Sequence, residues 1–184
     1  MFINHEREKL IQAIGYFAKN TRFCGKVKLF KLLYFLDFEH YKVTGRNVTG
    51  LTYHAWKYGP VPVSLYEELD SPEPDFASAI NISEISVRNS QPMLSLKPLA
   101  EFSVELFTKR ELKLLEKLAS EYRETQSEDM IEATHLENMP WDRVYNQQGN
   151  KQAVIPYEYA IAINEKEEML KIISEREAAL GAIQ

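Results

Sequence analysis

Residues 26–66 read KVKLFKLLYFLDFEHYKVTGRNVTGLTYHAWKYGPVPVSLY, and the rest of the chain is organised around this stretch. At 100° per residue, residues 26–42 form a helix that is apolar over most of its circumference. Other elements must cover most sides of such a helix, so we expect it to be the buried centre of the core. Its main apolar side carries Val27, Phe30, Leu33, Tyr34, Phe38 and Tyr41.

The charged residues of this helix are confined to a narrow arc. Lys28, Lys31, Glu39 and Lys42 lie opposite the main apolar side, with Phe35 in the middle of them. The spacing therefore predicts an open, solvent-facing side that contains Lys28, Lys31 and Phe35.

Two residues interrupt the apolar side with polar groups. Asp37 and His40 are three positions apart and so are neighbours on one helix face. They could form an acid/base or metal pair, or a structural pair tied to backbone groups or to a base such as Arg46. Buried carboxylates and imidazoles need partners wherever they occur, and nothing nearby completes a catalytic set, so we favour the structural interpretation.

A turn and an aromatic bend follow the helix. Gly45 is well placed to end it in a left-handed conformation. Residues 51–58, LTYHAWKY, suit a short strand packed on both faces. The strand is then expected to stop at Gly59, Pro60, Val61 and Pro62, because each proline fixes φ and removes a backbone donor. The result is a rigid bend with Trp56, Tyr58 and Tyr66 close to it in sequence.

The same residues carry a resemblance to a known family. The central stretch resembles the signature of the Panacea domain, the SocA-like antitoxin family that is also called phage-associated or GepA-like protein. A second block, SEDMIEATHLENMPW, resembles the family's later motif and places His135, Pro140 and Trp141 in matching positions. The likeness covers roughly residues 5–163. The matching residues of the first block are Lys31, Leu32, Leu33, Tyr34, Phe35, Asp37, Gly45, Arg46, Gly50, Ala55, Trp56, Gly59, Pro60 and Val61.

The resemblance implies a protein that binds another protein rather than an enzyme. Members of the family are associated with neutralising a cognate toxin by direct contact, within prophage-associated two-gene systems. In the SocA branch they also deliver the toxin to a Clp-type protease. Neutralisation needs a complementary surface with a few aromatic or arginine anchors. Our candidate anchors, any of whose aromatics could instead be core residues, are Lys28, Lys31, Phe35, Tyr53, Trp56, Tyr58, Tyr66 and Trp141.

Nucleic acid is a competing partner. Five basic residues cluster before and along the central helix and could contact phosphates. They are Lys19, Arg22, Lys26, Lys28 and Lys31. A DNA-binding regulator of its own operon is therefore the alternative function. The net charge of −5 makes a dedicated nucleic-acid binder the weaker hypothesis.

The remaining chain predicts one mainly helical domain with a small antiparallel sheet or hairpin. Residues 82–97 alternate loosely and suggest a hairpin with a turn at residues 89–92. Thr108 and Glu111 form a capping box that starts another helix. In the later part of the chain, we interpret His135 as a structural histidine. We expect residues 1–163 to form the Panacea-like domain and residues 164–184 a C-terminal helix, either packed or facing a partner or a second copy.

Enzyme chemistry finds little support in the sequence. There is no phosphate-binding loop, dinucleotide fingerprint or zinc-protease motif, and the histidines show no metal-ligand spacing. We expect no catalytic site, metal or cofactor. A hydrolase that uses Asp37 and His40 is the least favoured hypothesis. No apolar run approaches the length of a spanning helix, and the single cysteine, Cys24, fits a reducing cytoplasm.

Overall fold

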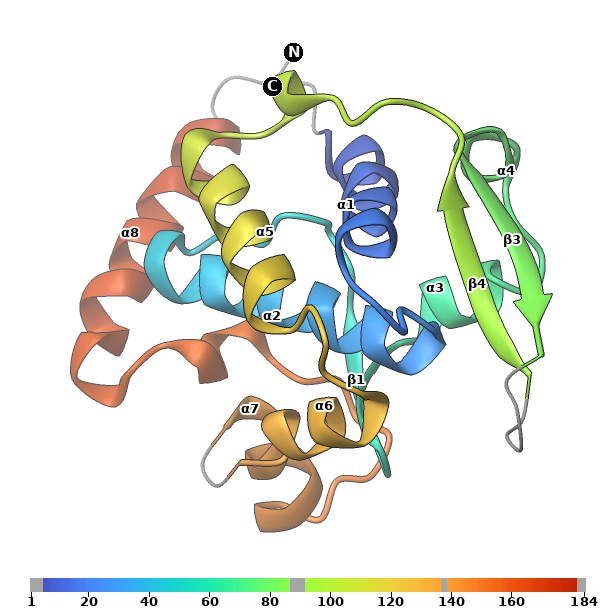
Figure 1. Cartoon of the computed structure of the whole chain (residues 1–184). Coiled ribbons are helices and arrows are strands. Elements are labelled where there is room, and N and C mark those ends of the chain that lie inside the picture. The colour runs from blue at the N-terminus through green and yellow to red at the C-terminus, as the bar shows by residue number, and fades with distance from the viewer. Residues whose placement is uncertain (1–4, 87–91, 137–138, 182–184) are drawn as a thin grey trace.

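The computed structural model describes residues 5–86, 92–136 and 139–181. One long helix, α2, runs through the middle, and the other elements surround it (Figure 1). The helices are α1 (Glu6–Asn20), α2 (Lys26–Thr44), α3 (Val63–Glu68), α4 (Pro74–Ala79), α5 (Lys109–Glu121), α6 (Ser127–Thr134), α7 (Pro140–Asp142) and α8 (Lys166–Gly181). The strands are β1 (Tyr53–Trp56), β2 (Gly59–Pro62), β3 (Ile80–Ile85) and β4 (Met93–Pro98). Short turns of helix complete the fold at Val104–Leu106, Arg143–Gln147, Tyr157–Ala160 and Ile163–Glu165.

The central position predicted for α2 is confirmed. Every residue of this helix from Lys28 to Tyr41 is buried except Glu39. The helices α1, α5 and α6 and the strand β2 all pack against it. The helix ends as predicted: Gly45 takes a left-handed conformation (φ 66°), and its N–H donates to Tyr41 O.

The β structure forms two separate two-stranded antiparallel sheets rather than one small sheet. The predicted hairpin is present, since β3 pairs with β4 from Ile80↔Pro98 to Ile85↔Met93; the predicted turn residues 89–91 lie outside the described residues. The other sheet contains a strand that the sequence did not predict. Gly59–Pro62 does not stop β1 but turns back and pairs with it, from Tyr53↔Pro62 to Trp56↔Gly59.

Two prolines fit into β2 because it is an edge strand. Pro60 and Pro62 alternate with Gly59 and Val61, which keep their N–H groups, so the ladder to β1 survives at alternate residues. The other edge of β1 is also occupied: Ala55 N–H donates to Ala153 O, and Ile155 N–H donates to Tyr53 O. Residues 152–155 thus extend the β1–β2 hairpin into a small three-stranded ribbon.

The periphery is tied down by a cap and by a terminal helix. The predicted capping box of α5 is present, with reciprocal hydrogen bonds between Thr108 and Glu111. The helix α8 lies against the end of α2, where Arg176 donates to Thr44 O. Within the described parts of the chain, no helix combines the length and the apolar character needed to cross a membrane.

Candidate functional site

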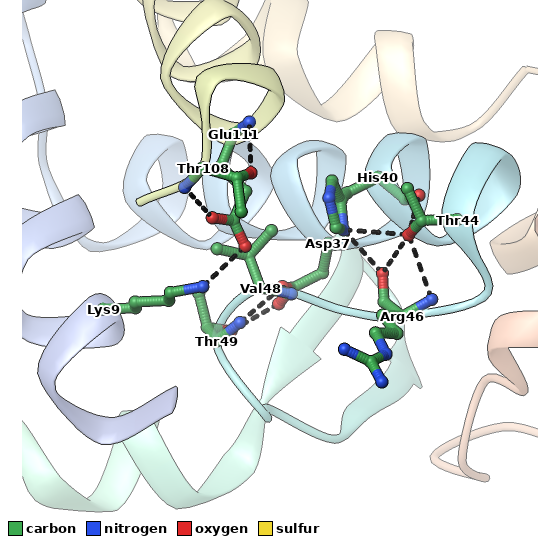
Figure 2. A network of polar contacts seen from close by, with 9 residues as sticks. All are labelled: Lys9, Asp37, His40, Thr44, Arg46, Val48, Thr49, Thr108 and Glu111. Carbon is green, nitrogen blue, oxygen red and sulfur yellow. Dashed lines mark hydrogen bonds and ion pairs between the residues drawn. The ribbon is translucent and has the colours of Figure 1, made fainter. Parts of the chain in front are cut away.

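Asp37 lies at the centre of a buried polar network that fixes the chain after α2. Its side chain is fully enclosed by the core. One carboxylate oxygen accepts hydrogen bonds from the N–H groups of Val48 (2.8 Å) and Thr49 (2.9 Å), as Figure 2 shows. The other accepts from the hydroxyl groups of Thr49 and Tyr53. Burial raises the pKa of Asp37 to about 6, and these four donors oppose that rise.

His40 stabilises the same loop from the next turn of the helix. Its Nδ1 lies 2.7 Å from Arg46 O and 3.2 Å from Thr44 Oγ1 (Figure 2). The exposed guanidinium of Arg46 takes no part in this contact, which uses the backbone carbonyl. Desolvation lowers the pKa of His40. Asp37 and His40 therefore hold residues 44–49 in place through hydrogen bonds to the backbone and to Thr44 and Thr49.

A second cluster closes over this loop from α1 and α5. Glu111 is buried, and its carboxylate accepts from Thr108 N–H (2.6 Å) and pairs with Lys9 Nζ (2.7 Å). Figure 2 shows this cluster beside Val48 and Thr49. Glu111 caps α5 and also binds Lys9 of α1. Its single carboxylate therefore joins these two helices across residues 44–49.

The prediction of an open side on α2 is wrong. Lys28, Lys31 and Phe35 are buried, at 0%, 1% and 5% exposure. Lys28 Nζ donates to the carbonyls of Arg22 (2.7 Å), Arg123 (3.2 Å) and Thr125 (2.7 Å). Three carbonyls satisfy all the donors of an ammonium group, which explains how it tolerates the interior. Phe35 is covered by the stacked ring of Tyr122, 5.4 Å between centroids.

Lys31 supports the β1–β2 hairpin from inside. Its Nζ donates to Pro60 O at 2.9 Å, and desolvation lowers its pKa to about 7. The neighbouring Gly59 has φ 98°, and a Cβ there would lie 2.7 Å from both Lys31 Nζ and Thr134 Oγ1. The hairpin thus needs glycine at this position both for its backbone conformation and for space.

Tyr53 and Trp141, two of the candidate anchors, are also core residues. Tyr53 is fully buried and binds Asp37. Trp141 is 2% exposed; its ring stacks between His135 (3.7 Å) and Tyr145 (4.7 Å), and its Nε1 donates to Trp56 O. His135 uses its ring for this stack, and its buried Nε2 has no hydrogen-bond partner in the described part of the chain. These two aromatic residues hold the hairpin in place and present no surface of their own.

Three candidate anchors do reach the surface, and all belong to the hairpin or to α3, which follows it. Tyr58 is 61% exposed at the hairpin turn. Trp56 and Tyr66 are half-buried, and their rings pack on each other at 5.3 Å. Lys26 Nζ lies over the second ring of this pair, 4.0 Å from the centroid of Tyr66. The hairpin that carries Trp56 and Tyr58 is therefore held in place by Lys31, which binds Pro60 O, and by Trp141, which binds Trp56 O.

The cationic strip that favoured nucleic acid is much reduced in the folded protein. Lys28 and Lys31 are interior, Arg22 pairs with Glu124, and Lys26 pairs with Asp70. Among the described residues, no group of three or more His, Cys, Asp or Glu side chains could hold a metal ion.

Together these features define a mainly helical domain whose buried helix fixes an aromatic hairpin through main-chain hydrogen bonds. The family model of the antitoxin SocA-like, Panacea domain matches residues 29–142, and the chain belongs to this family. The matched segment contains Lys31, Asp37, Gly59 and Trp141. Membership supports an antitoxin role and, in general terms, a toxin as partner. No curated protein and no solved structure matches the chain.

Proposed function

We propose that this protein is a non-catalytic antitoxin that neutralises a cognate toxin by direct contact through the aromatic face Trp56–Tyr58–Tyr66. The observation that carries the proposal is the exposure of Tyr58, 61%, on a hairpin whose backbone is fixed from within. Tyrosine and tryptophan supply large contact areas, and few of their side-chain torsions must be ordered on binding, so they are favoured as interface anchors.

The supporting geometry is one of preorganisation. Lys31 binds Pro60 O on one strand, and Trp141 binds Trp56 O on the other. A hairpin fixed at both strands loses little further conformational freedom on association, so more of the contact energy remains as affinity. The polar groups of Asp37 and His40 are used for the same loop and strand, which is consistent with a binding role rather than a catalytic one.

The test uses the gene that neighbours this one. Its product is expressed alone and together with the antitoxin; we expect growth arrest in the first case, rescue in the second, and a complex on size-exclusion chromatography. A harmless neighbour that forms no complex would overturn the proposal. Following the lifetime of the toxin in the rescued cells separates neutralisation by contact, which leaves the toxin intact, from delivery to a Clp-type protease, which removes it.

The aromatic face is tested with a matched pair of variants. Tyr58→Ala removes the exposed ring and is expected to weaken the complex at least about tenfold while leaving the melting temperature unchanged. Val104→Ala truncates a residue of similar exposure, 55%, on a different part of the surface and should change neither. Equal affinity of the two variants would place the contact elsewhere.

A further inference from the structure

The outer face of the three-stranded ribbon combines aromatic and cationic side chains. Along β1, Tyr53 and Ala55 point inwards and are buried, whereas His54 and Trp56 point outwards and are half-buried. Val154 pairs with His54 on the third strand and is 50% exposed. Trp56 on this face packs against Tyr66 of α3, whereas Val154 and the adjacent Tyr58 remain exposed.

Three tyrosines next to the ribbon each have a lysine beside the ring. Tyr58 is at its turn, Tyr66 packs on Trp56, and Tyr145 stacks on Trp141, which binds Trp56 O. Lys57 lies 5.3 Å from the ring centroid of Tyr58, Lys151 lies 5.7 Å from that of Tyr145, and Lys26 lies 4.0 Å from that of Tyr66. We call these six residues the Lys–Tyr face. Each ammonium contacts a ring on one side and can accept an anion on the other.

Lys57 and Lys151 are brought to the same end of the ribbon by a β-bulge. Ala55 N–H donates to Ala153 O and Ala55 O accepts from Gln152 N–H, so two residues of the third strand face one residue of β1. Lys151 immediately precedes the bulge and Lys57 immediately follows β1. Neither lysine has an ion pair within the described residues, whereas Lys26 pairs with Asp70. In this part of the chain, two lysines without an ion pair thus lie beside the exposed ring of Tyr58.

We propose that the Lys–Tyr face binds an acidic segment of the toxin, a stretch that presents aspartate or glutamate side chains next to apolar ones. This inference rests on the proposed antitoxin function and names the chemistry of its partner. The protein as a whole carries a net charge of −5, so a cationic face would orient an acidic partner towards the hairpin and away from the rest of the surface.

An acidic polypeptide fits this face better than a nucleic acid. Proteins that bind duplex DNA through its phosphates typically use about six to ten cationic contacts. The Lys–Tyr face offers three lysines, one of which is already paired, on a chain of net negative charge. Two or three carboxylates would satisfy such a face, whereas a nucleic acid strand would meet the negative field of the remaining surface.

Charge reversal tests the proposal. The variant Lys57→Glu/Lys151→Glu changes the net charge by −4. Lys109→Glu/Lys113→Glu makes the same change on exposed residues near the start of α5, and the start of this helix lies away from the β1–β2 hairpin (Figure 1). Affinity for the toxin is measured by titration calorimetry at about 50 and 500 mM salt, after melting curves have confirmed that both variants fold. We expect the first variant to bind at least about tenfold more weakly at low salt, with the difference shrinking at high salt.

Each outcome separates this inference from the proposed function. If the Lys57→Glu/Lys151→Glu variant binds the toxin as tightly as the wild type does, the Lys–Tyr face is not the binding site. The same follows if the α5 variant loses as much affinity. In both cases the antitoxin function stands. No complex with the wild-type protein overturns the function, and the inference with it. Loss of the complex on nuclease treatment, together with binding of a 20-nucleotide oligo-uridine probe, would assign the face to nucleic acid and reject the acidic segment.

Discussion

The hydroxyl of Tyr53 donates to the carboxylate of Asp37 at 2.7 Å, and this contact joins β1 to the buried helix inside the core. The same carboxylate binds the backbone of Val48 and Thr49. One side chain therefore sets the path of the chain from the end of α2 to the first strand of the hairpin. The surface that we propose for toxin binding depends on that path, although Asp37 itself is shielded from any partner.

Replacing Asp37 by alanine should strongly destabilise the protein. The change leaves the N–H groups of Val48 and Thr49 and the hydroxyl of Tyr53 buried without an acceptor, at about 1–3 kcal/mol for each group left unsatisfied. We expect the free energy of unfolding to fall by at least about 3 kcal/mol in urea titrations. Val43→Ala, at an exposed position of the same helix, is the control and should lie within about 0.5 kcal/mol of wild type. A similar small loss for Asp37→Ala would contradict the role described.

Asp37→Asn separates the charge from the hydrogen bonds. The pKa of Asp37 is about 6 in the folded protein and its ordinary value is 3.8. Because the folded state holds this proton more tightly, wild-type stability should decrease as the pH rises from 4 to 6, by about 2 kcal/mol. The amide of asparagine does not titrate, so the stability difference between wild type and Asp37→Asn should shift in favour of the variant over that range. Parallel pH profiles of the two proteins would show that the carboxylate is not desolvated as described.

Lys31 should produce the opposite pH dependence. Its folded pKa is about 7, below the ordinary value of 10.5, so the unfolded chain binds the proton more tightly between these values. Wild-type stability relative to Lys31→Met should therefore increase as the pH rises from 7 to 9, by about 2 kcal/mol. Chemical denaturation at pH 7, 8 and 9 measures the difference. A stability difference between wild type and Lys31→Met that is the same at all three pH values would refute the prediction.

The sequence predicted local features well because they depend on neighbouring residues. The apolar periodicity of α2, the left-handed end at Gly45, the capping box at Thr108 and the β3–β4 hairpin each involve groups close together in the chain. Periodicity also gave α2 its central place, since a helix that is apolar on most sides has few other places to lie.

The burial of the lysines could not be predicted in this way. Lys28 is satisfied by carbonyls of residues 22, 123 and 125, and Lys31 by that of Pro60. Main-chain carbonyls are present at every residue, so no side-chain pattern marks where they converge. The same limit explains β2, because its prolines were interpreted as a stop signal, and only the pairing with β1 shows that they occupy an edge strand. Of the candidate anchors, the sequence could not tell Tyr53 and Trp141, which are core, from Tyr58, which is exposed.

Gly59→Ala should weaken the hairpin for two reasons. A Cβ at φ 98° is strained, and it would lie 2.7 Å from Lys31 Nζ and from Thr134 Oγ1. Relief requires moving Lys31 away from Pro60 O, which breaks the bond that supports β2. We expect a loss of about 2–4 kcal/mol in unfolding free energy, measured by urea titration. Gly181→Ala, where a Cβ would meet nothing within 4 Å, should be close to neutral, and a neutral Gly59→Ala would show that the hairpin adjusts freely.

The bulge that positions Lys151 offers a stabilising substitution. Gln152 has φ 65°, a left-handed conformation that costs a residue with a side chain about 1 kcal/mol and costs glycine little. Gln152→Gly should therefore raise the unfolding free energy by a few tenths to about 1 kcal/mol, since the greater freedom of glycine in the unfolded chain offsets part of the gain. Gly149, at φ 66° in the same turn, supplies the reverse test: its Cβ would meet nothing within 4 Å, so Gly149→Ala should lose about 1 kcal/mol through backbone strain alone. Thermal and urea unfolding of the two variants measures both the expected gain and the expected loss in unfolding free energy. Destabilisation by Gln152→Gly would mean that the side chain contributes more than its backbone conformation costs, and the bulge would then depend on glutamine itself.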